Sequence, residues 1–150
     1  MKKNEIQIIW FKRDLRTSDH KPIYQASKSK IPLLPIYIVE PEYWEQAFAS
    51  RRHWHFIHDC LIELRQDLKQ LGQGLIVRVG SVADIFKEFS DHHHIKNIYA
   101  HEETGNQWTY NRDIKVQKWC KKNNIILNEF PTNGVVRGLK NRSEWSKIRK

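Results

Sequence analysis

The sequence predicts an α/β protein built on a three-layer, doubly wound, five-stranded parallel sheet of order 3-2-1-4-5, a Rossmann-like fold. Five apolar runs of strand length alternate with helical segments along the 150 residues. This alternation is typical of a parallel sheet with helices on both faces. The length corresponds to one domain and is sufficient to bury a hydrophobic core.

The first strand is predicted at residues 6–11, an apolar run that ends in Lys12-Arg13-Asp14-Leu15-Arg16. Four of these five residues are charged, so the segment is expected to leave the sheet at its carboxyl edge. Ligand-binding loops of open parallel sheets lie at that edge. The alternative interpretation is a solvated loop. A short helix is predicted at residues 19–27, with Ser18 or Asp19 as its N-cap.

The second strand is predicted at residues 33–39, with Pro35 near its beginning. The longest helix is expected over residues 51–71, with Ser50 as its N-cap and Gly72 at its end. Its apolar face recurs at spacings of three and four residues, which is the helical period. The members of this face are Ile57, Leu61, Leu64, Leu68 and Leu71.

The third strand is predicted at residues 75–79. The next helix begins after Gly80, where Ser81 and Asp84 have the spacing of a capping box. Its buried stripe is expected to consist of Val82, Ile85, Phe86 and Phe89. The remaining elements are a strand at residues 97–100, a helix at 108–122 and a strand at 125–130.

The domain is placed at residues 1–130, and residues 131–150 are interpreted as a basic linker. From Arg137 to Lys150 there are six basic residues and one acid, Glu144. The whole chain has 26 Lys and Arg against 17 Asp and Glu, a net charge of +9. This excess is compatible with anionic partners, nucleic acid included, without choosing among them.

A cytoplasmic location is expected from two features. Cys60 and Cys120 lie in helical patterns without a disulfide framework, which favours buried, reduced thiols. The apolar stretch near the N-terminus is too short, and charged residues follow it too soon, for a signal peptide. No run approaches 18 apolar residues, so no membrane span is predicted.

The sequence lacks the motifs typical of phosphate binding, nucleophilic catalysis and metal binding. There is no Walker A sequence, and Gly72-Gln73-Gly74 lacks the third glycine of a dinucleotide fingerprint. No nucleophile elbow is present, and neither cysteine has an activating neighbour. His92-His93-His94 is interpreted as a surface loop, while His55 and His58 share a helix face without a third ligand. We therefore predict no metal site and no catalytic residue.

The predicted strand order places a crevice between the loops after strands one and four, where the chain reverses direction. Arg13 and Asp14 on one side are expected to face Glu103, Asn106 and Trp108 on the other. The chain has six tryptophans, and indoles near such a crevice suit a flat aromatic ligand, with core packing as the alternative.

Trp10-Phe11-Lys12-Arg13-Asp14-Leu15-Arg16, followed by Asp19-His20, resembles the N-terminal signature of the DNA photolyase/cryptochrome family. Residues 34–41, the long helix after Ser50 and the segment Asn133-Gly134-Val135-Val136 support the resemblance, which covers essentially the whole chain. It implies the family's N-terminal α/β domain. In many members this domain holds an antenna chromophore of folate, deazaflavin, flavin or lumazine type.

The resemblance also implies partners. A second, all-helical domain binds FAD and damaged DNA in this family, and residues 1–150 do not include it. The full-length protein is therefore expected to act in light-driven DNA repair or blue-light sensing, as a lyase or a photoreceptor. We expect residues 1–150 alone to be inactive in photorepair. The alternative function is a free-standing nucleotide-binding or interaction module without light chemistry.

The candidate chromophore-binding residues combine the crevice residues with family positions. Trp108-Thr109 stands where folate-binding members tend to have Asn-Glu, a departure that disfavours folate. Arg112 and Asp113 match the end of the same motif and are expected to form an ion pair. The full candidate set is Phe11, Arg13, Asp14, Glu103, Asn106, Trp108, Thr109 and Asn111.

Overall fold

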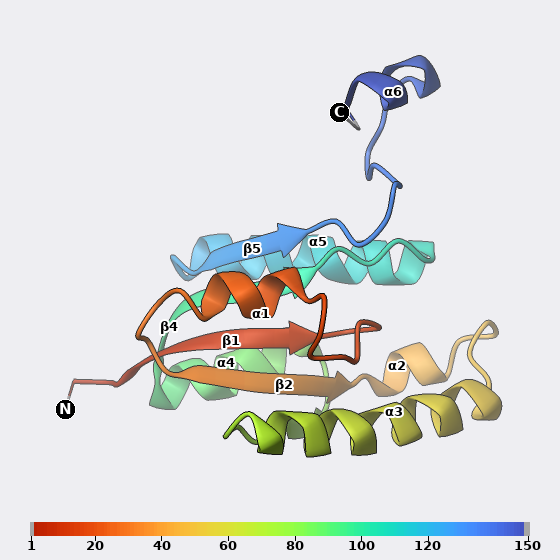
Figure 1. Ribbon diagram of the computed structural model, residues 1–150. Coiled ribbons are helices and arrows are strands. Elements are labelled where there is room, and N and C mark those ends of the chain that lie inside the picture. Colours follow the sequence, from red (N-terminus) through yellow and green to blue (C-terminus); the bar gives the residue numbers. More distant parts are fainter. Residues whose placement is uncertain (1, 149–150) are drawn as a thin grey trace.

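A computed structural model describes residues 2–148 and contains a five-stranded sheet of order β3-β2-β1-β4-β5 (Figure 1). All neighbouring strands are parallel. The predicted fold class and strand order are therefore confirmed. The strands are β1 (Glu5–Phe11), β2 (Leu33–Val39), β3 (Ile76–Val79), β4 (His94–His101) and β5 (Ile126–Phe130).

Helices cover both faces of the sheet. The side chains of α1 and α3 pack on one face, and those of α4 and α5 pack on the other. A short helix, α2, lies beyond the carboxyl end of β2 (Figure 1). The bounds are α1 (Lys21–Ala26), α2 (Pro41–Trp44), α3 (Arg51–Gln70), α4 (Val82–His92) and α5 (Gln107–Lys122).

The central strand β1 is apolar on both of its faces because each face is covered by helices. Ile8 and Trp10 belong to the core beneath α4 and α5. Ile9 and Phe11 belong to the core beneath α1 and α3. A continuous apolar run at this position is thus the expected sequence of the middle strand of a doubly wound sheet.

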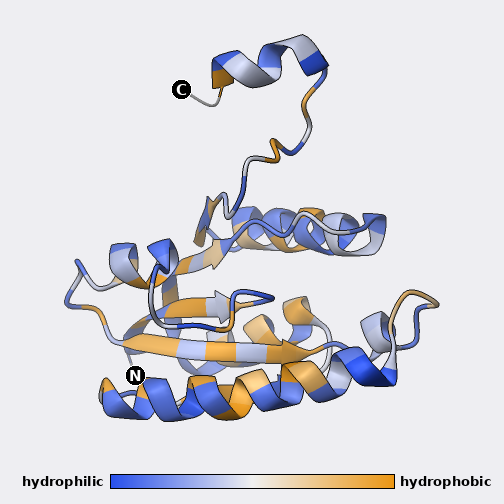
Figure 2. Ribbon diagram, turned by 45° about the vertical axis from the view of Figure 1, so that its right-hand side comes forward, coloured by the Kyte–Doolittle hydropathy of each residue, from blue (hydrophilic) through white to orange (hydrophobic). Residues whose placement is uncertain are grey.

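Helix α3 follows the predicted amphipathic pattern, and hydrophobic and hydrophilic residues alternate along it in Figure 2. Ser50 caps it by accepting a hydrogen bond from the backbone N–H of His53. The assignment of Leu71 to the buried face is wrong, since Leu71 is 65% exposed. The helix ends at Gln70, and Gly72 follows with a φ of 81°, so the chain turns away before Leu71 reaches the sheet.

We expect Leu61→Ala to lower the free energy of unfolding by about 2–3 kcal/mol, in the lower part of the range for buried leucines. Leu61 is 8% exposed and lies in the core beneath α1 and α3, so truncation leaves a cavity at the edge of that core. Urea denaturation measures the change. Ile62→Ala on the same helix is the control, because Ile62 is 47% exposed. Equal midpoints for the two variants would contradict the helix phase.

The start of α1 differs from the prediction. The N-cap is His20, not Ser18 or Asp19, and its Nδ1 accepts a hydrogen bond from the backbone N–H of Ile23. Histidine is an unusual cap, and a hydrogen bond to the buried Asp14 in the loop after β1 holds this ring in place. Helix α2 was not predicted, because its four residues are too few for a periodic pattern.

The triple histidine is not a surface loop. His92 ends α4, His93 is its C-cap, and His94 begins β4, which starts three residues before the predicted position. Within this extension only Ile95 points into the core, so no apolar run marks it. Cys120 is buried as expected, whereas Cys60 is only half-buried, and both are free thiols.

Residues 131–148 leave the sheet after β5 and extend away from it as an arm (Figure 1). The arm contains a 3-10 turn (Arg142–Glu144) and helix α6 (Trp145–Ile148). The indole N–H of Trp145 donates to the Gly134 carbonyl at 2.6 Å. The domain boundary at residue 130 stays a prediction. Across residues 2–148, no helix combines the length and the apolar character that crossing a bilayer requires.

Candidate functional site

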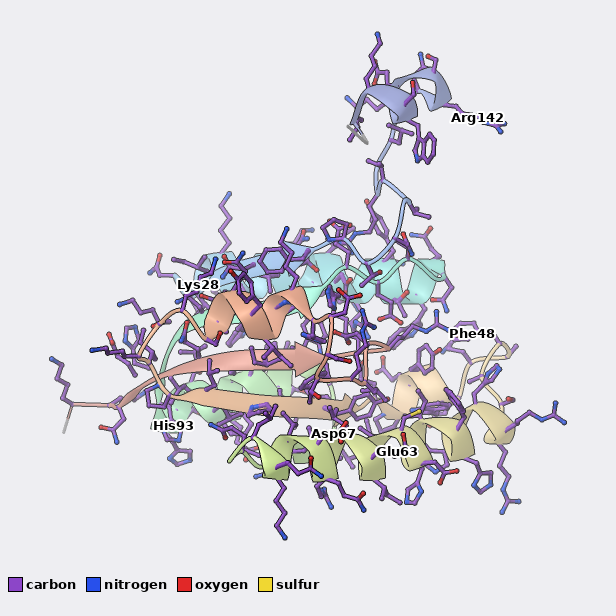
Figure 3. All side chains as sticks on the ribbon, in the orientation of Figure 1. Lys28, Phe48, Glu63, Asp67, His93 and Arg142 are labelled. Carbon is purple, nitrogen blue, oxygen red and sulfur yellow. The ribbon has the colours of Figure 1, made fainter. Side chains whose placement is uncertain are left out.

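The carboxyl ends of the parallel strands meet at one edge of the sheet, so the loops after β1, β2 and β4 lie near one another. Two of these loops form the predicted crevice. The third joins β2 to α3 through α2 and includes Phe48, which lies at the far end of this connection (Figure 3). Side chains from all three loops build the site.

Buried and exposed residues are interleaved in the charged segment after β1. Lys12 and Asp14 are buried, whereas Arg13 and Arg16 are exposed. The solvated-loop alternative therefore fails for Lys12 and Asp14. A buried charge requires hydrogen-bonded or charged partners, and both residues have them.

Asp14 joins the loop after β1 to the start of α1 and to the end of β4, 87 positions away. Its Oδ2 accepts hydrogen bonds from His20 Nε2 at 2.6 Å and from His101 Nδ1 at 2.7 Å. Its Oδ1 accepts from the backbone N–H of Lys12 at 2.9 Å. Burial alone would raise the pKa of Asp14, but the hydrogen bonds from His101 and His20 outweigh burial and hold this pKa well below its ordinary value.

The same three side chains, Asp14, His20 and His101, place their ligand atoms within 4.8 Å of one another, close enough to hold a metal ion. The hydrogen bond at the start of α1 argues against that use. Because His20 Nδ1 accepts from Ile23, the proton of the neutral ring is on Nε2, where it is donated to Asp14. A protonated nitrogen has no lone pair for a metal, so we interpret the cluster as a hydrogen-bonded anchor.

A network of ion pairs fills the space between β1, β5 and α5. Its centre is Asp113, which is 1% exposed and contacts Arg112 at 3.0 Å, Arg137 at 2.8 Å and Lys12 at 3.2 Å. The predicted pair between Arg112 and Asp113 is thus confirmed. Arg137 also contacts Glu129 at 3.1 Å, so the network ties the base of the C-terminal arm to the sheet.

Arg112 links this network to the neighbouring loops. Its guanidinium donates to Glu40, after β2, at 2.7 Å, and to Glu103, after β4. Burial would lower the pKa of Arg112, but Glu40, Glu103 and Asp113 together raise it, so the side chain stays charged. Burial raises the pKa of Glu40, and Arg112 opposes that rise.

A cavity of about 360 Å³ lies on the other side of Arg112, between the loop after β1 and the segment from β2 into α3. Six of its fifteen lining residues are Trp, Tyr or Phe, and six are Lys, Arg or Glu. Burial, reinforced by Glu40 and Glu103, raises the pKa of the Tyr37 hydroxyl, which stays protonated. The lining residues are Trp10, Phe11, Lys12, Arg13, Tyr37, Ile38, Glu40, Tyr43, Trp44, Arg52, His53, Phe56, Ile57, Glu103 and Arg112.

Three of the predicted site residues, Phe11, Arg13 and Glu103, line this pocket. Arg13 lies beside Gly105, where a Cβ atom would come within 3.2 Å of its guanidinium, and its Nε is 3.9 Å from Glu103 Oε1. Arg13 and Glu103 also border a smaller cavity of about 170 Å³ in the predicted crevice, together with Asp14.

The other predicted residues lie elsewhere. Asn106 caps α5, and Thr109 completes its capping box. Trp108 and Asn111 line a separate cavity against α4. Trp108 reaches the pocket only indirectly, by packing edge-on against Tyr43 with the ring centroids 5.4 Å apart.

Sequence reasoning missed the contribution of the segment after β2. Tyr43, Trp44, Arg52, His53 and Phe56 all line the pocket from this segment. The ring of Tyr43 also packs against Trp44 at 5.1 Å, which stiffens the wall. Such a density of aromatic and basic residues within 14 positions was the available signal, but a helical pattern explains most of it equally well.

The architecture is that of a doubly wound α/β binding domain, with an aromatic pocket at the carboxyl edge of its sheet. The profile described as DNA photolyase matches residues 7–141. The chain belongs to the DNA photolyase family, and the matched region is the family's N-terminal domain.

Relatives and solved structures agree with this assignment. The chain is 28% identical over 124 residues to a cryptochrome DASH, chloroplastic/mitochondrial, from Solanum lycopersicum, covering 79% of this chain and 21% of the relative. It is 25% identical over 138 residues to a deoxyribodipyrimidine photo-lyase from Buchnera aphidicola, covering 87% and 28%.

The fold matches a Synechocystis cryptochrome with a TM-score of 0.80 at 24% identity, covering 87% of this chain and 28% of the other. It matches an archaeal photolyase from Sulfolobus tokodaii with a TM-score of 0.76 at 23% identity, covering 96% and 34%. The chain thus spans about a fifth to a third of the length of these proteins.

Proposed function

We propose that this chain is the antenna-chromophore domain of a photolyase- or cryptochrome-type flavoprotein. The observation that carries the proposal is the aromatic pocket of about 360 Å³ at the carboxyl edge of the sheet. A light-harvesting chromophore must be held rigidly against apolar surface, with a few polar groups that set its orientation. Aromatic walls together with Tyr37, Glu40 and Glu103 meet both needs.

The partner in this proposal is a C-terminal, FAD-binding helical domain, and damaged DNA is contacted through the full-length protein. Light-driven repair or light sensing is then the activity of that larger protein, in the cytoplasm. The candidate chromophores are folate, deazaflavin, flavin and lumazine. The Sulfolobus tokodaii photolyase is described with two FAD molecules and an implied novel light-harvesting cofactor, which supports a flavin as one candidate here.

Titration with FMN, a deazaflavin, a lumazine and a folate tests the proposal. We expect saturable quenching of tryptophan fluorescence by at least one of them, because Trp10 and Trp44 line the pocket. Phe56→Ala should weaken that binding about five- to tenfold by removing one aromatic wall. Trp119→Phe, which alters the opposite core against Phe86, is the control.

Absence of saturable binding by all four compounds would contradict the proposal. The alternative function, an interaction module without light chemistry, would then gain support. Light-dependent repair of damaged DNA by this chain alone would contradict the assignment of catalysis to the helical domain.

A further inference from the structure

We propose that the ligand of the pocket carries an anionic group, a phosphate or a carboxylate, and that Arg13 and Arg52 bind it. The inference rests on the proposed function and deepens it, because it specifies the charge of the chromophore. The shared chemistry is an anionic oxygen group attached to a flat ring, whatever the identity of the ring.

The charges that line the pocket do not balance. Four lysine and arginine side chains face two carboxylates. Lys12 is paired with Asp113 and Glu129, which lie behind the pocket wall. Arg112 is surrounded by Glu40, Glu103 and Asp113. The two carboxylates of the lining are therefore held by Arg112, and neither Lys12 nor Arg112 is available to a ligand.

Arg13 and Arg52 remain. The side chain of Arg13 is 64% exposed, and its one ion-pair contact in the described part of the chain is long: its Nε lies 3.9 Å from Glu103 Oε1, while Arg112 binds the other oxygen of Glu103, Oε2. Within residues 2–148, Arg52 makes no ion pair, and it is exposed in the first turn of α3. His53 follows it and also lines the pocket. A weakly paired guanidinium from the loop after β1 and one from the start of α3 that is unpaired among the described residues thus line the same cavity.

A neutral ring in this pocket gains stacking and burial alone. A ring with a phosphate or carboxylate gains charge-assisted hydrogen bonds as well, which are stronger than neutral ones, and guanidinium groups match such anions in geometry. Arg112 contacts both Glu40 and Glu103 and offsets part of their negative charge, and Arg13 and Arg52 add two further positive charges to the lining. The pocket should therefore discriminate between ligands that differ only in charge.

Ring-matched pairs test this inference: FMN against riboflavin, and pterin-6-carboxylate against 6-hydroxymethylpterin. Affinity is measured by ligand fluorescence at low and at high NaCl. We expect the anionic member of the bound pair to bind at least about tenfold more tightly at low salt. High NaCl should reduce the ratio of the two affinities, because exposed charges are screened, and should leave the affinity for the neutral member nearly unchanged.

Variants assign the effect to the two arginines. Arg13→Ala and Arg52→Ala should each reduce the ratio between anionic and neutral ligand about three- to tenfold, without changing the affinity for the neutral ring. Arg13→Lys and Arg52→Lys should retain part of the preference for the anionic ligand. Arg65→Ala is the matched control, an exposed arginine on α3 about 20 Å farther along the helix than Arg52.

The outcomes separate the two proposals. Equal binding of both members of a pair, or a ratio unchanged in Arg13→Ala and Arg52→Ala, would overturn this inference and leave the antenna proposal standing. Absence of binding by these four compounds and also by the deazaflavin, the lumazine and the folate of the first titration would overturn both. Urea denaturation midpoints equal to that of the parent chain would show that each variant is folded.

Discussion

Asp14→Asn is expected to lower the free energy of unfolding by about 3–5 kcal/mol, the cost typical of removing one member of a buried charged group. The substitution keeps the shape of the side chain but replaces an acceptor with an amide. His20 Nε2 and His101 Nδ1 now both donate to the same oxygen, Asp14 Oδ2. The backbone N–H of Lys12 donates to the other oxygen, Oδ1. An amide offers only one acceptor oxygen, so at least one of these three buried N–H groups would lose its acceptor.

Urea denaturation at pH 7 measures this loss. Asp67→Asn is the matched control, because Asp67 is exposed on α3 (Figure 3) and should change stability by less than about 0.5 kcal/mol. Similar midpoints for the two variants would show that the hydrogen bonds of Asp14 contribute little to stability.

The pH dependence of Asp14 has a definite sign. Its folded-state pKa lies below the ordinary value of 3.8, so its contribution is fully present well above that value and is lost as the pH falls below it. We therefore expect the parent chain to lose stability between about pH 5 and pH 2 more steeply than Asp14→Asn. Parallel acid denaturation curves for the two proteins would contradict this expectation.

Arg112→Met is expected to have a comparable effect, about 3–5 kcal/mol at pH 8, because it leaves a set of buried carboxylates without their shared cation. Glu40, Glu103 and Asp113 all contact this guanidinium. Lys118→Met on the same helix is the control, since Lys118 is exposed. The measurement is the free energy of unfolding of both variants at several pH values.

Acid should partly rescue the Arg112→Met variant. Burial raises the pKa of Glu40 and Arg112 opposes that rise, so without the cation Glu40 should keep a folded-state pKa above its unfolded value. Its contribution to stability is then present at low pH and is lost as the pH rises. The deficit relative to the parent chain is therefore expected to shrink from pH 8 to pH 5. A deficit that is independent of pH would mean that Arg112 acts through packing alone.

Local pattern was sufficient for the sheet and for most of the helices. The continuous apolar runs of β1 and β2 and the three-four spacing of Leu61, Leu64 and Leu68 depend on neighbours in the chain, so they can be read from the sequence. Where a boundary depended on a side-chain contact made only in the folded chain, the prediction failed. His20 serves as a helix cap because Asp14 holds its ring, and no propensity encodes that.

The residues of the site also divide into those that could be predicted from the sequence and those that could not. Strand ends and the predicted strand order placed Arg13 and Glu103 at one edge of the sheet, and the family resemblance added Phe11. All three line the pocket, and their part in binding a chromophore stays a prediction. Sequence reasoning missed Tyr43, Trp44 and Arg52, which reach the pocket only through the path of the β2–α3 connection. That path depends on α2 and on the packing of Tyr43 against Phe48 and Trp108.

Periodicity and one contiguous motif were enough to establish the fold class, the strand order, the central strand and the family. The burial of Lys12 and Asp14, and the connection of three loops through Arg112, became evident only in the folded chain. The same holds for Arg13 and Arg52, which have no strong ionic partner among residues 2–148. The physical reason is that the pairing of charges depends on distances between residues as many as 117 positions apart, such as Lys12 and Glu129, and these distances exist only once the sheet has formed.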